Sequence, residues 1–184
     1  MKTNKFSFWS VTALFLLSAT ASSQQKAEQA EAGVGMRGLA AGQVRPMTVA
    51  FAEQLIAAAK KSSCSPPAGS CSGAFAVVDD AGVLVSLEII DGVLAAAPEL
   101  AIKKARTPAL WRRPTQAFLD AVNNGTNTTY MDGTYPDVTT SPGGIPLVKD
   151  GKIVGGFGIA GVGNASKQID DAVLAEATKI FGKQ

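Results

Sequence analysis

Two pairs of strand-like segments, each joined by a short turn, are the feature that most limits how this chain can fold. Apolar and β-branched residues fill 74–78 and 83–90, and Asp79-Asp80-Ala81-Gly82 lies between them. A second pair repeats the arrangement with 145–148, Lys149-Asp150-Gly151-Lys152 and 153–160. Short connections rich in Asp and Gly join antiparallel strands into β-hairpins. The sequence therefore predicts an antiparallel sheet built from hairpins.

Segments with helical periodicity surround these hairpins. The first has Thr48 as its N-cap and an apolar face formed by Ala52, Leu55, Ile56 and Ala59. Three more are predicted: Pro98 to between Thr107 and Trp111 with Pro108 as a kink or end, Pro114–Val122, and Ser166–Phe181 with a buried stripe of Ile169, Val173, Ala177 and Ile180. Because the strands are apolar on both faces, helices must cover the sheet. The predicted fold class is α/β, a sandwich of one antiparallel sheet and helices.

The N-terminus has the pattern of a cleaved signal peptide. Lys2 and Lys5 precede an apolar run at 6–17, which is shorter than the roughly 20 residues that span a bilayer. Ala19-Thr20-Ala21 provides small residues for a signal peptidase, so cleavage is expected before Ser22. An uncleaved anchor is the alternative. We expect a periplasmic or secreted protein with no membrane span after cleavage, a mobile leader at 22–45 and one domain at 46–184.

The charge balance after cleavage argues against nucleic acid as a partner. Removal of Lys2 and Lys5 from the 17 basic residues leaves 15, which equals the 15 acidic residues. Without a long-range positive field, binding to the phosphate backbone has no driving force. Near-zero net charge also opposes self-association only weakly.

Cys64 and Cys71 are expected to form a disulfide, because an exported chain meets an oxidising compartment and the pair closes a short loop containing Pro and Gly. A metal pair or a redox couple is the alternative. The spacing differs from Cys-x-x-Cys, and no histidine exists to complete a zinc site, so no metal site is predicted.

A polar interruption marks one face of the predicted helix that begins at Pro98. Leu100, Lys104, Thr107 and Trp111 follow helical spacing, so a cation and a hydroxyl share an otherwise apolar stripe. This face is either a pocket wall, with Lys104 and Arg106 near an anionic ligand, or a helix with a snorkelling lysine and a backbone-bonded threonine. Gly143-Gly144 would let backbone approach a ligand closely, or simply begin a strand.

Three blocks of the sequence together resemble the GlcG/HbpS-like haem-binding, or haem-degrading, family. They are Ala76 to Gly82 with Asp91-Gly92, Ala101 to Thr107 with Arg113-Pro114-Thr115, and Gly143 to Leu147 with Asp150-Gly151, Val154 to Gly161, Gln168 and Asp170-Asp171. The resemblance covers about 48–182 and implies a profilin-like sandwich. The chain departs from the family pattern at Pro108, where Ala is usual, at Arg112, where Gly is common, and at Ala160, where Ser is frequent.

The resemblance implies haem or another tetrapyrrole as the ligand, in scavenging, buffering or degradation. An enzyme or accessory subunit acting on a small organic acid, as in glycolate-type metabolism, and a ligand-free oligomeric module are the alternatives. Members of such families form homo-oligomers, which we also expect here. No catalytic residue is identified. Because the chain has no histidine, an iron ligand would have to be Tyr130, Met131, Tyr135, a lysine or water, and Tyr130 and Met131 lie in the long irregular stretch 123–142.

Overall fold

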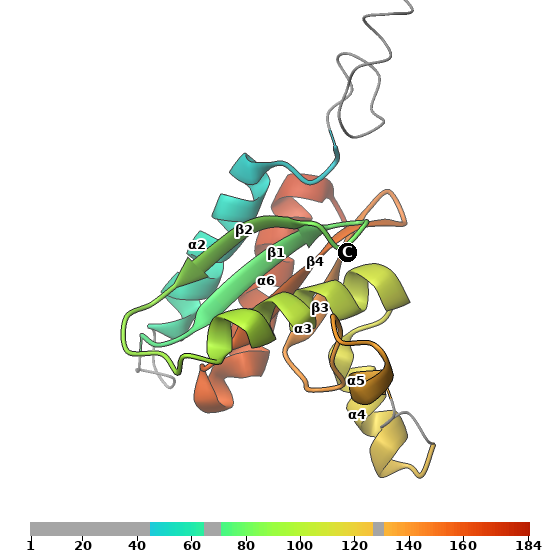
Figure 1. The fold of residues 1–184 in the computed structure, drawn as a ribbon. Helices are drawn as coiled ribbons and strands as arrows, with labels where there is room; N and C mark the ends of the chain where they lie inside the picture. The colour runs from blue at the N-terminus through green and yellow to red at the C-terminus, as the bar shows by residue number, and fades with distance from the viewer. Residues whose placement is uncertain (1–44, 65–70, 127–130) are drawn as a thin grey trace, which may run out of the picture. The chain divides into compact units, whose positions relative to one another are not determined.

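The computed structural model describes residues 45–64, 71–126 and 131–184. Four strands form one antiparallel sheet in the order β2-β1-β4-β3 (Figure 1): β1 (Ala74–Asp79), β2 (Leu84–Ile89), β3 (Gly144–Lys149) and β4 (Lys152–Ala160). Both predicted hairpins are present, β1 with β2 and β3 with β4. Antiparallel pairing of β1 with β4 joins them into a single sheet. The predicted signal peptide and nearly all of the predicted leader lie outside the described residues.

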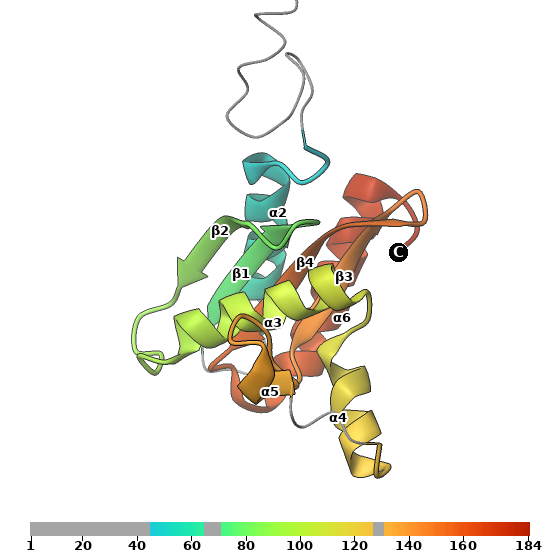
Figure 2. The same ribbon diagram turned by 45° about the vertical axis from the view of Figure 1, so that its right-hand side comes forward.

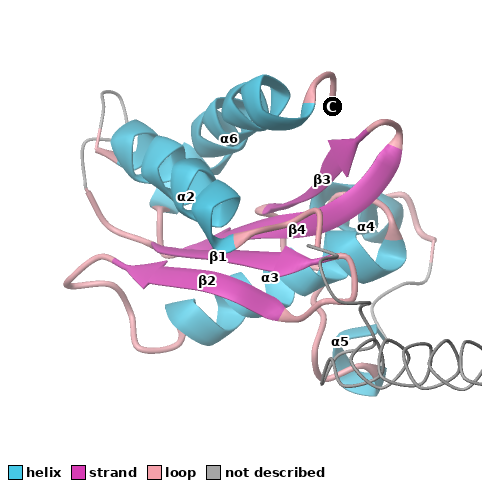
Figure 3. Ribbon diagram, turned by 90° about the horizontal axis from the view of Figure 1, so that it is seen from above, coloured by secondary structure: helices cyan, strands magenta, loops and turns pink. Residues whose placement is uncertain are grey.

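The helices lie on both faces of the sheet. They are α2 (Val49–Ser63), α3 (Ala97–Trp111), α4 (Thr115–Asn123), α5 (Met131–Thr134) and α6 (Ser166–Phe181), with a short 3-10 turn, η1, at Gly163–Ala165. Figure 3 shows α2 and α6 side by side over one face, while α3 crosses the other face. In Figure 2, α4 and α5 lie near α3 on its side of the sheet. The predicted α/β sandwich is therefore confirmed.

The face beneath α2 and α6 holds the large apolar side chains. Phe75, Phe157 and Ile159 project from the central strands and are fully buried. They pack against an apolar stripe on each helix, namely Ala52, Leu55, Ile56 and Ala59 on α2 and Ile169, Val173, Ala177 and Phe181 on α6. Burial of these side chains removes the most apolar area from water and supplies most of the hydrophobic stabilisation.

The face beneath α3 is built from small residues instead. Ala101, Ala105 and Ala109 of α3 pack on alanines and on Val78 of the sheet. A Cβ atom at Gly144, Gly156 or Gly158 would overlap a backbone carbonyl of α3, those of Lys104, Ala105 and Ala101 respectively. Gly144 and Gly158 are register partners, so the helix backbone lies directly on a glycine floor.

Pro108 does not end α3, which continues to Trp111 as the longer of the predicted limits. Proline has no N–H, so the carbonyl of Lys104 lacks its usual donor four residues later. That carbonyl is the one that faces Gly144. The helix tolerates the proline at a place where its freed carbonyl points into the sheet interface.

Two short-range features fix the ends of the first elements. The hydroxyl of Thr48 accepts a hydrogen bond from Phe51 N at 3.3 Å, which confirms the predicted N-cap of α2. Asp79 ends β1, and its carboxylate accepts from Ala81 N and Val83 N at 3.0 and 2.9 Å. Arg45 forms an ion pair with this buried carboxylate. Among the described residues, no helix is long and apolar enough to cross a bilayer.

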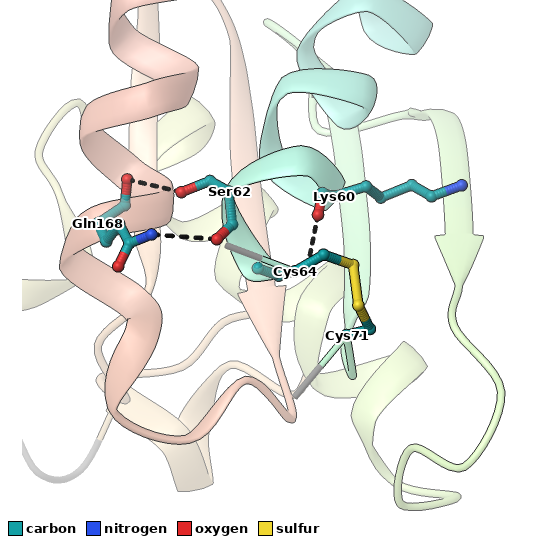
Figure 4. The surroundings of a disulfide bond; sticks show 6 residues. Lys60, Ser62, Cys64, Cys71 and Gln168 are labelled. Carbon is teal, nitrogen blue, oxygen red and sulfur yellow. Dashed lines mark hydrogen bonds between the residues drawn. A yellow bond between two sulfur atoms is a disulfide. The ribbon is translucent and has the colours of Figure 1, made fainter. Parts of the chain in front are cut away.

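The C-terminal end of α2 is linked by a disulfide to the segment before β1 and by hydrogen bonds to α6 (Figure 4). Cys64, the C-cap of α2, forms the predicted disulfide with Cys71, which lies just before β1. Beside it, Ser62 Oγ donates to Gln168 O at 3.3 Å, and Gln168 Nε2 donates to Ser62 O at 3.1 Å. These contacts link α2 to the start of α6.

Candidate functional site

Thr107, one of the predicted ligand-binding residues, is fully buried and bonded to the chain. Its hydroxyl lies 2.9 Å from Lys103 O and 3.1 Å from Thr139 O, and it accepts from Thr139 N at 2.9 Å. These bonds hold the segment that leads into β3 against α3. The backbone-bonded alternative therefore describes Thr107, and its role toward a ligand stays a prediction.

Arg106 also contacts the chain, although its side chain remains partly exposed. Its Nε donates to Gly82 O at 3.1 Å, and Nη1 lies 3.2 Å from Asp137 Oδ1. The guanidinium thus connects the first hairpin turn to the segment after α5. Because the side chain is 27% exposed and a guanidinium has five N–H donors, donors remain available for a further anion.

Lys104 of α3 lies close to Gly143, which directly precedes β3. It is 7% exposed, and its Nζ would be 3.4 Å from a Cβ placed on Gly143, whose φ is +107°. Burial lowers the pKa of Lys104, and the negative charge of Asp170 partly restores it. Gly144, which follows, donates its N–H to Thr115 Oγ1 at 2.8 Å. The structure therefore brings Lys104 close to Gly143 and Gly144, but α3 itself occupies the space next to Gly144, and the role of these residues toward a ligand stays a prediction.

Asp170 on α6 is the residue at this place to which the sequence assigned no role. Its pKa is raised to about 6, mainly by burial and also by the nearby charge of Asp171, while Lys104 and Lys167 act in the opposite direction. Its Oδ1 is buried without a hydrogen-bond partner. The ion pairs among the described residues do not include Lys104 with Asp170. A buried cation and a buried carboxyl, one on α3 and one on α6, thus interact through space.

The predicted iron ligands separate into described and undescribed residues. Tyr130 lies outside the described residues, and Met131 begins α5 with its side chain undescribed. Tyr135 follows α5 and is 44% exposed. No group of three or more His, Cys, Asp or Glu side chains is arranged to hold a metal ion in the described part of the chain.

Tyr135 belongs to a half-exposed aromatic patch, which we define as Leu110, Trp111, Phe118 and Tyr135. The Trp111 and Tyr135 rings meet edge to face with centroids 5.2 Å apart and an interplanar angle of 71°. Phe118 is buried behind Trp111, at a centroid distance of 6.3 Å. Leu110 and Trp111 are 45% and 37% exposed. Contiguous apolar surface of this kind marks interaction sites for ligands or partners.

One arginine contacts the aromatic patch, and two more lie near it in the sequence. The guanidinium of Arg113 lies 5.4 Å from the centre of the Phe118 ring, and the partly exposed Arg106 reaches Asp137, two residues after Tyr135. Arg112 caps α3 in the left-handed region with φ 61°. Glycine is the residue that this backbone conformation favours. The left-handed cap gives a physical reason why the family commonly has Gly at the position of Arg112.

A groove between α2 and α6 is a separate concave surface of about 660 Å³. Four alanines form its floor, and polar side chains surround them: Ala57, Ala58, Ala172 and Ala175, with Gln54, Lys61, Ser62, Gln168, Glu176 and Lys179. Its volume lies within the range of small-molecule sites. Its lining contains none of the side chains that usually coordinate haem iron.

Comparison with known proteins supplies the family. The family model described as haem degrading protein HbpS-like matches residues 47–179. Protein GlcG of Escherichia coli (strain K12) is 40% identical over 89 residues, which are 48% of this chain and 64% of that protein. The chain thus aligns with less than two thirds of the length of this curated relative.

Two solved structures resemble the fold. A double mutant of HbpS from Streptomyces reticuli has a TM-score of 0.61 at 25% identity, covering 74% of this chain and 88% of that one. The PduOC:Heme complex has a TM-score of 0.60 at 25% identity, covering 75% of this chain and 99% of that one.

Proposed function

Because the chain belongs to the family of haem-degrading, HbpS-like proteins, we propose that it binds haem or a closely related tetrapyrrole. The family match spans the whole sandwich from the start of α2 into α6. One of the structural relatives is a haem complex, which supports this ligand class. Fold and family alone set an expectation, so the proposal must also rest on a surface suited to the ligand.

The observation that carries the proposal is the aromatic patch with arginines around it. Haem combines a flat apolar macrocycle with two carboxylates on one edge, and this surface offers half-exposed Trp111 and Leu110 beside several guanidinium groups. Arginine binds carboxylates through two parallel N–H donors, which suits propionates. Aromatic rings fixed by their neighbours contact a flat ligand at low entropic cost. The side chains at the patch therefore fit the group.

In this proposal each element has a separate task. Phe118 holds Trp111 in place from behind, so that the indole presents a fixed apolar surface. Arg106, Arg112 and Arg113 provide positive charge at the rim, where propionates would remain accessible to water. Bound haem would supply an iron centre.

Haem titration of Trp111→Ala tests the proposal. Removing a large apolar contact costs about 1.5–3 kcal/mol, so haem should bind roughly ten- to a hundredfold more weakly than to the wild type, measured by the Soret absorption. Val49→Ala is the matched control, because Val49 is exposed on α2, far from the patch in the sequence. Unchanged affinity in Trp111→Ala, or no Soret change with the wild type, would contradict the proposal.

Two further variants separate the sites within this titration. Lys104→Ala tests the site predicted from the sequence, and Lys61→Ala tests the groove between α2 and α6. A ten- to hundredfold loss with Lys104→Ala and none with Trp111→Ala would move the ligand to the start of β3. A loss confined to Lys61→Ala would move it to the groove.

We also propose that the protein works outside the cytoplasm, where it would scavenge or buffer haem. The pattern of residues 1–21 and the Cys64–Cys71 disulfide support this location. N-terminal sequencing of the protein recovered from the periplasm or the medium should begin at Ser22. A sequence that still begins at Met1, or protein found only in the cytoplasm, would contradict export.

A small organic acid is the second candidate ligand, and the Lys104–Asp170 pair favours it. A carboxylate would meet the buried ammonium, and a donor on the same molecule would satisfy Asp170 Oδ1, which has no partner. Calorimetric titration with short hydroxy acids should then give heat that disappears in Lys104→Ala and persists in Trp111→Ala. The reverse pattern would exclude this candidate.

A further inference from the structure

The identity of an iron ligand is open in a chain without histidine, and this inference rests on the proposed binding of haem. Histidine, cysteine, methionine and tyrosine are the side chains that usually hold haem iron. Both cysteines form the disulfide, and Met47 is 3% exposed within the core. Among the side chains that the structure describes, Tyr135 is the exposed member of this set.

Tyr135 also has the surroundings that a haem ligand needs. The Trp111 ring meets the Tyr135 ring edge to face, with centroids 5.2 Å apart. Two side chains from distant segments thus share one surface. Pro136 follows it directly and restricts the backbone there. Leu110, the neighbour of Trp111 on α3, is a further exposed apolar side chain. A macrocycle lying on this surface would have apolar support next to the phenol.

The charges near Tyr135 favour an anionic ligand. Asp137, the nearest acidic residue in sequence on its C-terminal side, forms an ion pair with Arg106. Arg112 and Arg113 add two exposed cations at the end of α3. Arg112 occupies a left-handed backbone position that glycine favours, directly after Trp111 in the chain. The guanidinium of Arg106 thus offsets the carboxylate of Asp137, which would otherwise disfavour an anion near Tyr135.

We infer that Tyr135 would hold the iron of bound haem through its phenol oxygen and that the site would select the ferric form. When the phenol binds ferric iron, its O–H bond breaks, an O–Fe bond forms, and the proton passes to solvent with no change in the oxidation state of iron. A phenolate is a hard, anionic ligand, so it prefers the ferric to the ferrous ion. Because coordination releases a proton, affinity for ferric haem should decrease as the solution becomes more acidic.

Tyr135→Phe is the matched variant, because it removes the oxygen and keeps the ring that packs on Trp111. The purified protein with ferric haem should show a phenolate-to-iron charge-transfer band and a high-spin ferric signal in electron paramagnetic resonance. Tyr135→Phe should lose the band and bind ferric haem at least tenfold more weakly. Reduction with dithionite should weaken haem binding in the wild type and have less effect in Tyr135→Phe.

Iron-free protoporphyrin separates coordination from packing. If Tyr135 acts through iron, protoporphyrin should bind the wild type and Tyr135→Phe with similar affinity. Equal spectra and affinities for ferric haem in the two proteins would overturn the assignment and leave haem binding itself intact. Loss of the band in Tyr130→Phe, with no effect in Tyr135→Phe, would assign the ligand to Tyr130. No Soret change with the wild type would overturn both this inference and the proposed function.

Discussion

Lys104 on α3 and Asp170 on α6 attract each other electrostatically but form no ion pair. Burial disfavours the charged form of each group, and their attraction only partly offsets it. The pKa of Asp170 is therefore raised from its usual value of 3.8 to about 6. The folded protein thus binds the proton of this carboxyl more tightly than the unfolded chain does.

We expect Asp170→Asn to stabilise the protein in neutral and alkaline solution. A raised pKa means that the folded state binds the proton more tightly. In the wild type, the stability contributed by the protonated carboxyl is therefore complete below about pH 4 and is lost as the pH rises through 6, whereas the neutral amide of the variant does not lose it. The difference between the two pKa values corresponds to at most about 3 kcal/mol at pH 8, and partial exposure reduces it to about 1–2 kcal/mol.

Urea unfolding at pH 4 and pH 8 measures this difference. The gain of Asp170→Asn over the wild type should be present at pH 8 and nearly absent at pH 4. Asp91→Asn is the control, because Asp91 is exposed and its removal should act alike at both pH values. Equal or lower stability of Asp170→Asn at pH 8 would mean that its attraction to Lys104 outweighs the cost of burial.

The sequence located part of the candidate site and missed its partners. Helical spacing placed Lys104 and Thr107 on one face of α3, and the structure buries both there. Their partners, Thr139 and Asp170, come from segments far along the chain, and no local pattern connects them. The meeting of Tyr135 with Trp111 likewise depends on how α5 returns to the end of α3, which periodicity does not specify.

The contact between α3 and the sheet depends on glycine at three positions. We expect Gly158→Ala to destabilise the protein, because its Cβ would overlap the carbonyl of Ala101 and backbone must move to relieve it. Overpacking of this kind costs about 1–3 kcal/mol. Thermal unfolding measures the loss. Gly133→Ala is the control, since nothing lies within 4 Å of its added Cβ; equal melting temperatures for the two variants would contradict the prediction.

The disulfide should stabilise the connection between α2 and β1. Replacing both Cys64 and Cys71 by serine removes a cross-link that closes a short loop, and the chain-entropy model gives about 2.5 kcal/mol for it. Chemical unfolding without reductant should show this loss, and reductant should lower the stability of the wild type to that of the variant. Two titratable thiols in the unreduced, denatured wild type would show that the bond does not form in solution.

Elements were easier to predict than their arrangement. The hairpins and the long helices followed from turn residues and apolar spacing, and their limits agree within one or two residues. The order of strands did not follow, because the pairing of β1 with β4 joins segments that are distant in the sequence. The face of the sheet that α3 covers did not follow either, because Gly144 and Gly158 become neighbours only through the pairing of β3 with β4.

At the scale of the whole molecule, we expect the protein to form a homo-oligomer. β2 is an edge of the described sheet, and Leu84 and Ile89 at its ends are 39% and 49% exposed. An uncovered apolar edge strand is a template for pairing with another chain. Light scattering at micromolar concentration should give a mass of at least two chains, and Leu84→Lys combined with Ile89→Lys should reduce it. A wild-type monomer would contradict this expectation.

The position of β4 at the centre of the sheet has a consequence for how the chain is made. Residues 152–160 complete both the β1 and the β3 pairings, and they lie far along the chain from β1. The sheet can therefore close only after β4 has emerged from the ribosome, and contacts between distant segments form slowly. During synthesis the first hairpin has no partner to complete its core. A nascent chain of this topology therefore exposes one side of β1 without its strand partner until β4 has been synthesised.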